Sequence, residues 1–234
     1  MHMRSSFLLL LGFLNFVTLG HADTLDAITF ATQPGKLFIP VHEAIDELDW
    51  EVVRDAQCHV TRLNTLELRP GMLRQLVDGT ELVSTEQLAT AGAVVSTMNA
   101  EGEVKVGGFF HGFTLRAGAQ RVEVSLKNQR LKGWQGERLV LETKISSGRN
   151  GATPAGEFHA GPYRSKLHFS SLYNNAPMPW SVQLHRHIFI HGFSSVPDYP
   201  ASHGCIRMPL TGGNAARFFY EWVLSGTPVS VTKD

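Results

Sequence analysis

The sequence has little that could hold a fold together covalently, and it has no excess of charge of either sign. Only two of its 234 residues are cysteine, Cys58 and Cys205, which excludes a disulfide scaffold. Lys and Arg together number 21, as do Asp and Glu, so the composition predicts neither an overall basic surface for nucleic acid nor an acidic tail. Hydrophobic residues make up 43% of the chain, which excludes disorder and allows a buried core.

Long apolar runs are also scarce, since only one occurs, at residues 7–19. Arg4 precedes this run, and Ala22 closes a short stretch of small residues after it. A basic start, an apolar centre and small residues at the end are typical of a secretory signal, so we expect residues 1–22 to be a signal peptide cleaved after Ala22. The alternative is an uncleaved anchor, although the run is short for a membrane span. We expect an exported protein of the periplasm or cell envelope, without a stable membrane span after cleavage.

The charge is distributed unevenly along the chain. Residues 23–118 contain 14 acidic and 7 basic residues, a net charge of −7, whereas residues 119–234 contain 7 acidic and 13 basic residues, a net charge of +6. A glycine-rich stretch at 107–112 precedes the change and predicts turn-rich connecting structure. We therefore place a domain boundary near Gly118.

The acidic part repeats one pattern of strand, polar turn and short helix. Residues 36–41 predict a strand that leads into a helix at 42–48, and residues 79–84 predict a strand that leads into a helix at 85–91. Ser84 is the expected N-cap of the second helix. No catalytic motif accompanies the pattern, so we expect 23–118 to be a small α+β module with a structural or interaction role.

The basic part predicts a different architecture. Val122, Val124 and Leu126 alternate with polar residues, which is the period of a half-buried strand. Further strands are expected at 138–145, 156–160, 187–191 and 228–232. A helix is expected at 214–224, capped by Asn214. The predicted fold class is mainly β, a β-rich sandwich or open barrel with one late helix, preceded by the small α+β module.

The segment 202–207, Ser-His-Gly-Cys-Ile-Arg, is the most informative stretch of the sequence. Buried structural cysteines usually have apolar neighbours, whereas Cys205 lies in a polar, glycine-containing segment of the kind that carries a reactive thiol. Gly204 allows close approach of the backbone, so the N–H groups of Gly204 and Cys205 could face a developing oxyanion. Arg207 adds a positive charge that favours the thiolate and could also hold a substrate carboxylate.

A thiol nucleophile needs a base within reach. His191 ends a predicted strand 14 residues before Cys205 and is followed by Gly192. Asp198 is the only acidic residue between the two, so a backbone carbonyl could orient the imidazole in place of a carboxylate.

His191-Gly192, a spacer and the segment 202–207 together resemble the L,D-transpeptidases of bacterial envelopes, which have a YkuD-like catalytic domain. The resemblance covers residues 119–234 and includes Gln129 and the segments 147–158 and 178–180. It implies a β-rich sandwich with a cap over the cleft.

The resemblance also implies roles for seven residues. Cys205 would be the nucleophile and His191 the general base, with the backbone carbonyl of Gly192 orienting the imidazole. His203 and Gly204 would shape the site and the oxyanion hole. Arg207 and Ser202 would lie on the substrate-binding side, where Ser202 braces the loop. Members of this family attack the bond between the third and fourth residues of a peptidoglycan tetrapeptide stem. They release the terminal D-Ala and pass the acyl group to an amine. The expected partners are stem peptides and an envelope protein as acceptor, and we expect no cofactor and no metal.

Three alternatives stay open. The same nucleophile could serve an L,D-carboxypeptidase or hydrolase in which water accepts the acyl group. The chain could instead be a wall-binding protein without catalysis. A zinc hydrolase would use four histidines: His185, His187, His191 and His203. Because a disulfide would consume the nucleophile, we also expect Cys58 and Cys205 not to pair with each other.

Overall fold

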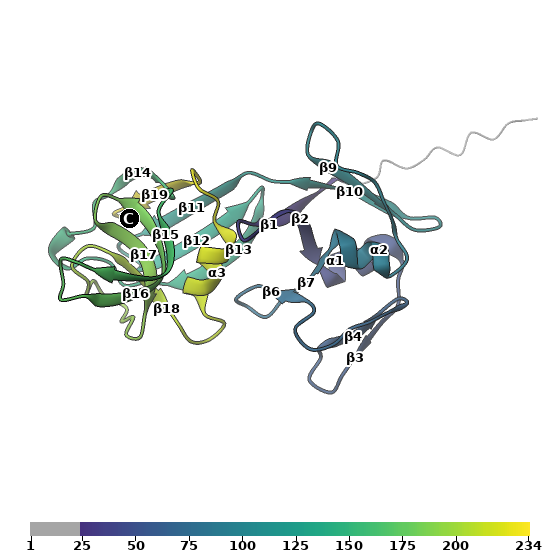
Figure 1. The fold of residues 1–234 in the computed structure, drawn as a ribbon, viewed down its shortest axis with the longest axis horizontal. Helices are drawn as coiled ribbons and strands as arrows, with labels where there is room; N and C mark the ends of the chain where they lie inside the picture. The colour runs from purple at the N-terminus through teal and green to yellow at the C-terminus, as the bar shows by residue number, and fades with distance from the viewer. Residues whose placement is uncertain (1–23) are drawn as a thin grey trace, which may run out of the picture.

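The computed structural model of the protein describes residues 24–234, so the predicted signal peptide lies outside the described residues. The acidic and basic parts form the two ends of an elongated molecule (Figure 1). Within residues 24–234, no helix has the length and apolar character needed to cross a membrane.

The acidic part contains ten strands and two short helices. Seven of the strands form one sheet in the order β6-β7-β2-β1-β10-β9-β8, and the other three form a small sheet. The bounds are β1 Thr24–Phe30, β2 Gln33–Pro40, α1 Val41–Leu48, β3 Val52–Arg54, β4 Val60–Leu63, β5 Leu66–Glu67, β6 Arg74–Gln75, β7 Glu81–Ser84, α2 Thr85–Thr90, β8 Val94–Val95, β9 Glu103–Gly107 and β10 Gly112–Ala117. Both predicted strand-to-helix units are present, as β2 with α1 and β7 with α2.

The predicted cap of α2 is confirmed. The Ser84 hydroxyl accepts a hydrogen bond from the backbone N–H of Gln87 at 3.2 Å, and the Gln87 side chain accepts one from the backbone N–H of Ser84 at 2.9 Å. This reciprocal capping box satisfies two N–H groups that a helix start would otherwise leave without partners.

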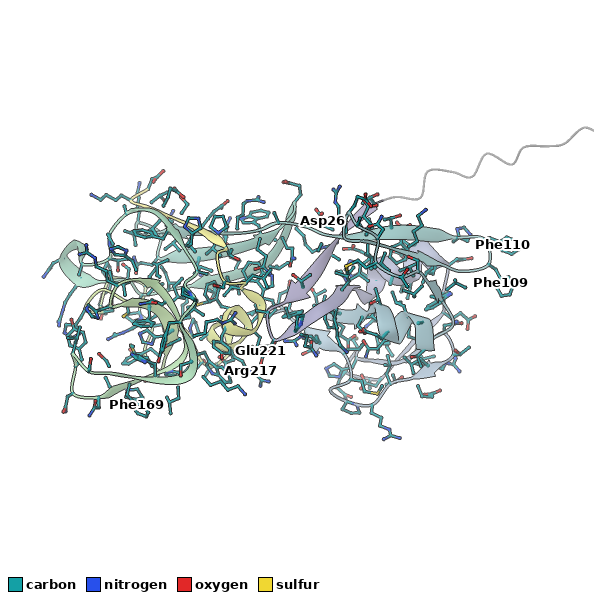
Figure 2. All side chains as sticks on the ribbon, turned by 45° about the horizontal axis from the view of Figure 1, so that its top comes forward. Asp26, Phe109, Phe110, Phe169, Arg217 and Glu221 are labelled. Carbon is teal, nitrogen blue, oxygen red and sulfur yellow. The ribbon has the colours of Figure 1, made fainter. Side chains whose placement is uncertain are left out.

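The glycine-rich stretch at 107–112 forms a turn, as expected. It turns β9 into β10 as the tip of a hairpin inside the N-terminal sheet, and β10 then pairs in parallel with β1. The chain passes from β10 to the first strand of the basic part through residues 118–119. Phe109 and Phe110 stand at the hairpin tip, 99% and 93% exposed, at the end of the molecule away from the basic part (Figure 2).

The basic part is built from two sheets and one helix, as the predicted fold class required. One sheet has the strand order β13-β12-β11-β19-β14 and the other the order β15-β16-β17-β18. The bounds are β11 Gln120–Ser125, β12 Arg130–Gln135, β13 Arg138–Lys144, the 3₁₀ turn η1 Arg149–Gly151, β14 Gly156–His159, β15 Arg164–Ser170, β16 Ala176–His185, β17 Ile188–Phe193, β18 Ile206–Pro209, α3 Ala215–Trp222 and β19 Pro228–Thr232. The Asn214 side chain caps α3 by accepting a hydrogen bond from Arg217 N at 3.0 Å.

Helix α3 is the centre of the core. Its residues Phe218, Phe219 and Trp222 are buried among side chains from both sheets. A Cβ on Gly133 of β12 would lie 2.8 Å from the Trp222 ring, so only glycine lets the strand approach the indole this closely. The indole N–H donates to the Gln135 side chain at 3.1 Å, which satisfies its polar group inside the core.

The acidic part packs against the other side of α3. The N–H groups of Ala31 and Thr32 donate to the carbonyls of Trp222 and Glu221, both at 3.3 Å. Arg74 forms an ion pair with Glu221, which lies at this junction in Figure 2. Five residues of the acidic part belong to the same hydrophobic core cluster as α3: Ile28, Phe30, Phe38, Leu76 and Leu82. The acidic part also has a second core cluster of its own, so the two parts share the cluster around α3 and not a single core.

Candidate active site

Two adjacent parallel strands bring the predicted site residues together. β17 pairs with β18 so that His191 lies beside Arg207 and Ile190 beside Ile206. Side chains alternate between the two faces of a strand, and the buried Ile190 and Ile206 point into the core against α3. His191 and Arg207 therefore occupy the opposite face. Cys205 lies directly before β18, with its sulfur against the backbone of β17 at Phe189.

A backbone carbonyl fixes the imidazole of His191, as the resemblance implied. His191 is 4% exposed, and its Nδ1 lies 2.8 Å from the carbonyl oxygen of Gly192. Because a carbonyl can only accept, this hydrogen bond assigns the proton to Nδ1 and leaves Nε2 as a proton acceptor. Gly192 has no room for a side chain, since a Cβ would lie 2.4 Å from Leu210 Cδ2 and 3.1 Å from Ala216 Cβ.

The electrostatic surroundings keep this imidazole neutral. Burial is the largest cause that lowers the pKa of His191, to about 4, and the charges of Arg207 and His168 act in the same direction. The hydrogen bond to Gly192 opposes them. At neutral pH the side chain is thus an unprotonated base.

Cys205 is held in its thiol form. Burial raises the pKa of Cys205, against the N–H of Phe189 and the charge of Arg207. The sulfur accepts a hydrogen bond from Phe189 N at 3.5 Å and lies 3.8 Å from the carbonyl oxygen of His187. Both contacts are with backbone groups at residues 187 and 189, close to His191 along the chain, and neither is with the His191 imidazole. Catalytic hydrogen bonds commonly shorten only when substrate binds.

The loop before the nucleophile is braced from within. The Ser202 hydroxyl donates to the carbonyl of Cys205 at 2.5 Å and accepts from Gly204 N at 3.0 Å. Ser202 is 2% exposed, so the structure supports the bracing and offers no surface of this residue for substrate binding. The expectation that the Gly204 N–H faces an oxyanion needs correction, because Ser202 occupies that N–H. The backbone N–H of Cys205 is the remaining candidate donor.

His203 lies at the exposed rim of the site. Its ring is exposed and stacks on Tyr173, with centroids 4.4 Å apart and an interplanar angle of 18°. Its Nε2 contacts the Arg149 guanidinium. Because a guanidinium only donates, the contact makes this nitrogen the acceptor. Sequence reasoning missed both partners, although Arg149 stands out as a lone charge in a glycine-containing loop.

An aromatic group that the sequence did not reveal borders the thiol. The ring of His168 stacks on Phe189, with centroids 4.9 Å apart, and Tyr163 Oη lies 2.8 Å from His168 Nδ1. Since the Phe189 backbone donates to the sulfur, these rings form one wall of the site. Only the β15–β16 hairpin, which we did not predict, brings Tyr163 and His168 to this position.

The zinc alternative finds no geometric support. No group of three His, Cys, Asp or Glu residues is gathered to hold a metal ion in the described part of the chain. His185 packs beside Phe158, His203 lies on Tyr173, and His191 is engaged with its own carbonyl.

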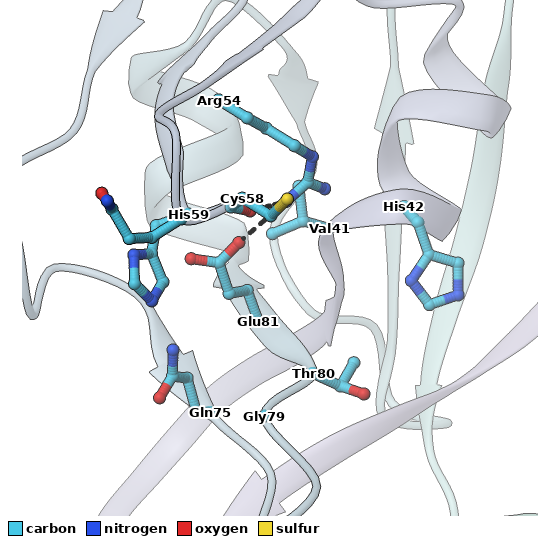
Figure 3. Close-up of a pocket in the computed structure, with 10 residues that line it drawn as sticks. Val41, His42, Arg54, Cys58, His59, Gln75, Gly79, Thr80 and Glu81 are labelled. Atoms are coloured by element: carbon cyan, nitrogen blue, oxygen red, sulfur yellow. Dashed lines mark hydrogen bonds and ion pairs between the residues drawn. The ribbon is translucent and has the colours of Figure 1, made fainter.

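The second cysteine lies in the acidic part. Cys58 is exposed and free, and Cys205 is also free, as predicted. Cys58 borders a hollow of about 430 Å³ (Figure 3). Arg54 donates to the Cys58 carbonyl at 2.8 Å and forms an ion pair with Glu81 at 3.2 Å. The guanidinium thus links the loop that carries Cys58 to the Glu81 carboxylate. No buried, oriented imidazole accompanies this thiol in the hollow, in contrast to Cys205.

A partly buried thiol next to the strand that carries a carbonyl-oriented imidazole is the pair of groups that cysteine acyl-transfer chemistry requires. Residues 119–231 match the family model of the YkuD L,D-transpeptidase catalytic domain. The matched residues make up a little under half of the chain, and they contain every residue of the candidate site.

The chain is also similar to individual known proteins. YciB of Bacillus subtilis (strain 168), which bears the provisional name of an L,D-transpeptidase, is 27% identical over 128 residues, covering 47% of this chain and 64% of that protein. Among solved structures, an L,D-transpeptidase from Xylanimonas cellulosilytica is 28% identical, with a TM-score of 0.44, and covers 50% of this chain and 61% of its own. One from Mycobacterium smegmatis is 12% identical, with a TM-score of 0.44, and covers 92% and 96%. The chain therefore spans less than two thirds of the first two relatives.

Proposed function

We propose that this protein is an exported cysteine L,D-transpeptidase that acts on peptidoglycan tetrapeptide stems. The observation that carries the proposal is the hydrogen bond between His191 Nδ1 and the Gly192 carbonyl, which leaves Nε2 as a proton acceptor on the strand whose backbone also contacts the Cys205 sulfur. The family match of residues 119–231 supports the reaction class. The apolar run at 7–19 and its flanking residues support export.

In the first half-reaction, Cys205 Sγ attacks the carbonyl carbon between the third and fourth stem residues. The thiol proton passes to His191 Nε2 as the S–C bond forms, because the raised pKa of the thiol and the lowered pKa of the imidazole disfavour a thiolate beforehand. The C–N bond then breaks, and His191 gives the proton to the leaving amine of D-Ala. A thioester remains on Cys205.

In the second half-reaction, an amine attacks the thioester. Its nitrogen forms the new C–N bond and loses a proton to His191 Nε2, the S–C bond breaks, and the sulfur takes the proton back. The thiol and the neutral imidazole are restored, so no cofactor is consumed. Water in place of the amine would give a carboxypeptidase, and the chemistry at Cys205 would be the same.

The N–H of Cys205 would stabilise the oxyanion in both steps, with Gly204 held by Ser202 as the brace. The net charge of +6 on residues 119–234 would attract a carboxylate-rich cell-wall polymer at long range.

The proposal is tested by incubating purified protein with defined muropeptides and identifying the products by mass spectrometry. Dimers joined between two third-position residues are expected. Shortened stems without dimers would indicate the carboxypeptidase, and unchanged substrate would indicate a wall-binding protein. Cys205→Ala is the control, since it removes the nucleophile and leaves the fold's other contacts in place.

A further inference from the structure

Two arginines beside the thiol have no carboxylate partner in the described part of the chain. None of the ion pairs among residues 24–234 includes Arg149 or Arg207. Arg207 is half-buried and lies with its guanidinium carbon 4.0 Å from the centre of the Phe193 ring. A cation that is partly removed from water without a counter-charge is costly, so this face is suited to an anion from outside the chain.

The backbone brings the two arginines to the same place. The backbone N–H of Ser146 donates to the carbonyl of Arg207, and the N–H of Arg207 donates to the carbonyl of Ser146, both at 3.0 Å. Three residues after Ser146, the N–H of Arg149 donates to the Ser202 carbonyl at 3.0 Å. Between them, a Cβ on Gly148 would lie 2.8 Å from Gly204 Cα. Residues 146–149 therefore run directly along the loop that carries the nucleophile.

The side chain of Arg149 is positioned there by two rings. Its Nη2 donates to His203 Nε2, and His203 is stacked on Tyr173 of the β15–β16 hairpin. The two guanidinium groups also influence each other. The pKa of Arg207 is lowered mainly by burial, with a further contribution from the charge of Arg149, while Cys205 acts in the opposite direction. Arg207 nevertheless stays charged at physiological pH, because a guanidinium ordinarily titrates far above it.

We propose that Arg149 and Arg207 together bind the carboxylate of the residue that leaves, which makes Arg149 a specificity-determining residue for peptides that end in a free carboxylate. This inference rests on the proposed function. In such a peptide the terminal carboxylate carbon lies within about 4 Å of the scissile carbonyl carbon, so attack by Cys205 places the carboxylate among the side chains that flank the thiol. A planar guanidinium is the group best matched to a carboxylate. His203 is a positioning residue that acts through Arg149.

The test uses two tetrapeptides that differ only at the C-terminus, one a free acid and one an amide. We expect the wild-type protein to prefer the acid by about tenfold or more in kcat/KM, as charge-assisted hydrogen bonds allow. Arg149→Gln should remove about tenfold of that preference while leaving the iodoacetamide reactivity of Cys205 unchanged. His203→Phe keeps a ring to stack on Tyr173 but removes the acceptor, and should remove part of the preference. Arg130→Gln, the same charge change at an exposed residue of β12, should leave it intact.

Binding separates this inference from the proposed reaction. On the Cys205→Ala background, calorimetry should show tighter binding of the acid than of the amide, and adding Arg149→Gln should abolish the difference. That binding ratio decides the carboxylate site, and turnover by the wild-type protein decides the reaction. Acid preference without turnover would leave the site standing and refute the transpeptidase. Equal binding of the two peptides, or an acid preference that survives Arg149→Gln, would overturn the carboxylate site.

Discussion

Replacing His191 by asparagine separates the base from its structural role. The asparagine amide can still donate to the Gly192 carbonyl, but it offers no proton acceptor of comparable strength. At pH 7 we expect kcat/KM to fall by about two to four powers of ten. The wild-type rate should be flat from about pH 5 upward, because the pKa of His191 is lowered to about 4. The variant rate should rise about tenfold per pH unit without a plateau below pH 9, because burial raises the pKa of Cys205 from 9.0 and only the thiolate reacts unaided.

The assay follows product formation by mass spectrometry across this pH range, with circular dichroism to confirm that each variant is folded. Cys205→Ala should be inactive at every pH. His185→Ala, which removes an exposed imidazole packed beside Phe158, should keep the wild-type profile. A wild-type rate for His191→Asn at pH 7 would refute the general-base role. A plateau of that variant near pH 7 would show a preformed thiolate and refute the protonated thiol.

Four further outcomes are expected. From the resemblance to the family we expect a carbapenem-type β-lactam to acylate Cys205, so intact-protein mass spectrometry should find the adduct on wild type and none on Cys205→Ala. N-terminal sequencing of exported protein should begin at Asp23. Gly192→Ala should lower the free energy of unfolding by about 1–3 kcal/mol, measured in urea, because the new Cβ meets Leu210 at 2.4 Å. The pKa of His191 is lower in the folded protein than its ordinary value of 6.5, so the unfolded chain takes up the proton first as pH falls. Between pH 7 and pH 5 the free energy of unfolding of the wild type should therefore fall by about 2 kcal/mol more than that of His191→Asn.

Local patterns were sufficient where one face of an element is buried. The alternation at 122–126 predicted β11, and the stop signals after α3 led directly to β19, which begins and ends where expected. The cap at Ser84 predicted the start of α2 because its hydrogen bonds are formed within three residues. Such elements depend on neighbours in sequence, which is the information a single chain contains.

The β15–β16 hairpin could not be predicted in this way. β15 is largely exposed and therefore has no regular alternation of buried residues. β16 contains Pro177 and Pro179, which normally argue against a strand, and Trp180 has a φ of 56°. Pairing with β15 and β17 overrides these local signals, and the position of Tyr173 and His168 in the site follows from that pairing.

In the candidate site, too, local features could be predicted from the sequence and long-range contacts could not. Cys205, Gly204 and Ser202 are adjacent in sequence, so a motif could identify them together. Their hydrogen bonds were less predictable, because the engagement of the Gly204 N–H depends on where the Ser202 hydroxyl points. Arg149 reaches His203 across 54 residues, and such a contact depends on tertiary structure that no local pattern encodes.

The core cluster that the two parts share also constrains what the acidic part does. Phe30 of β1 meets Phe218 of α3 edge to face, with ring centroids 5.8 Å apart, on one side of the helix. On another side of the same helix, Ala216 packs against Gly192: a Cβ added to Gly192 would lie only 3.1 Å from the Ala216 methyl group. Helix α3 is thus held by the acidic part and in turn supports the residue whose carbonyl orients His191. Removing residues 24–118 would expose the Phe30 side of α3 to water and take two backbone donors from its carbonyls. We therefore expect the acidic part to support the fold of residues 119–234, and we expect these residues to lose stability when expressed without it.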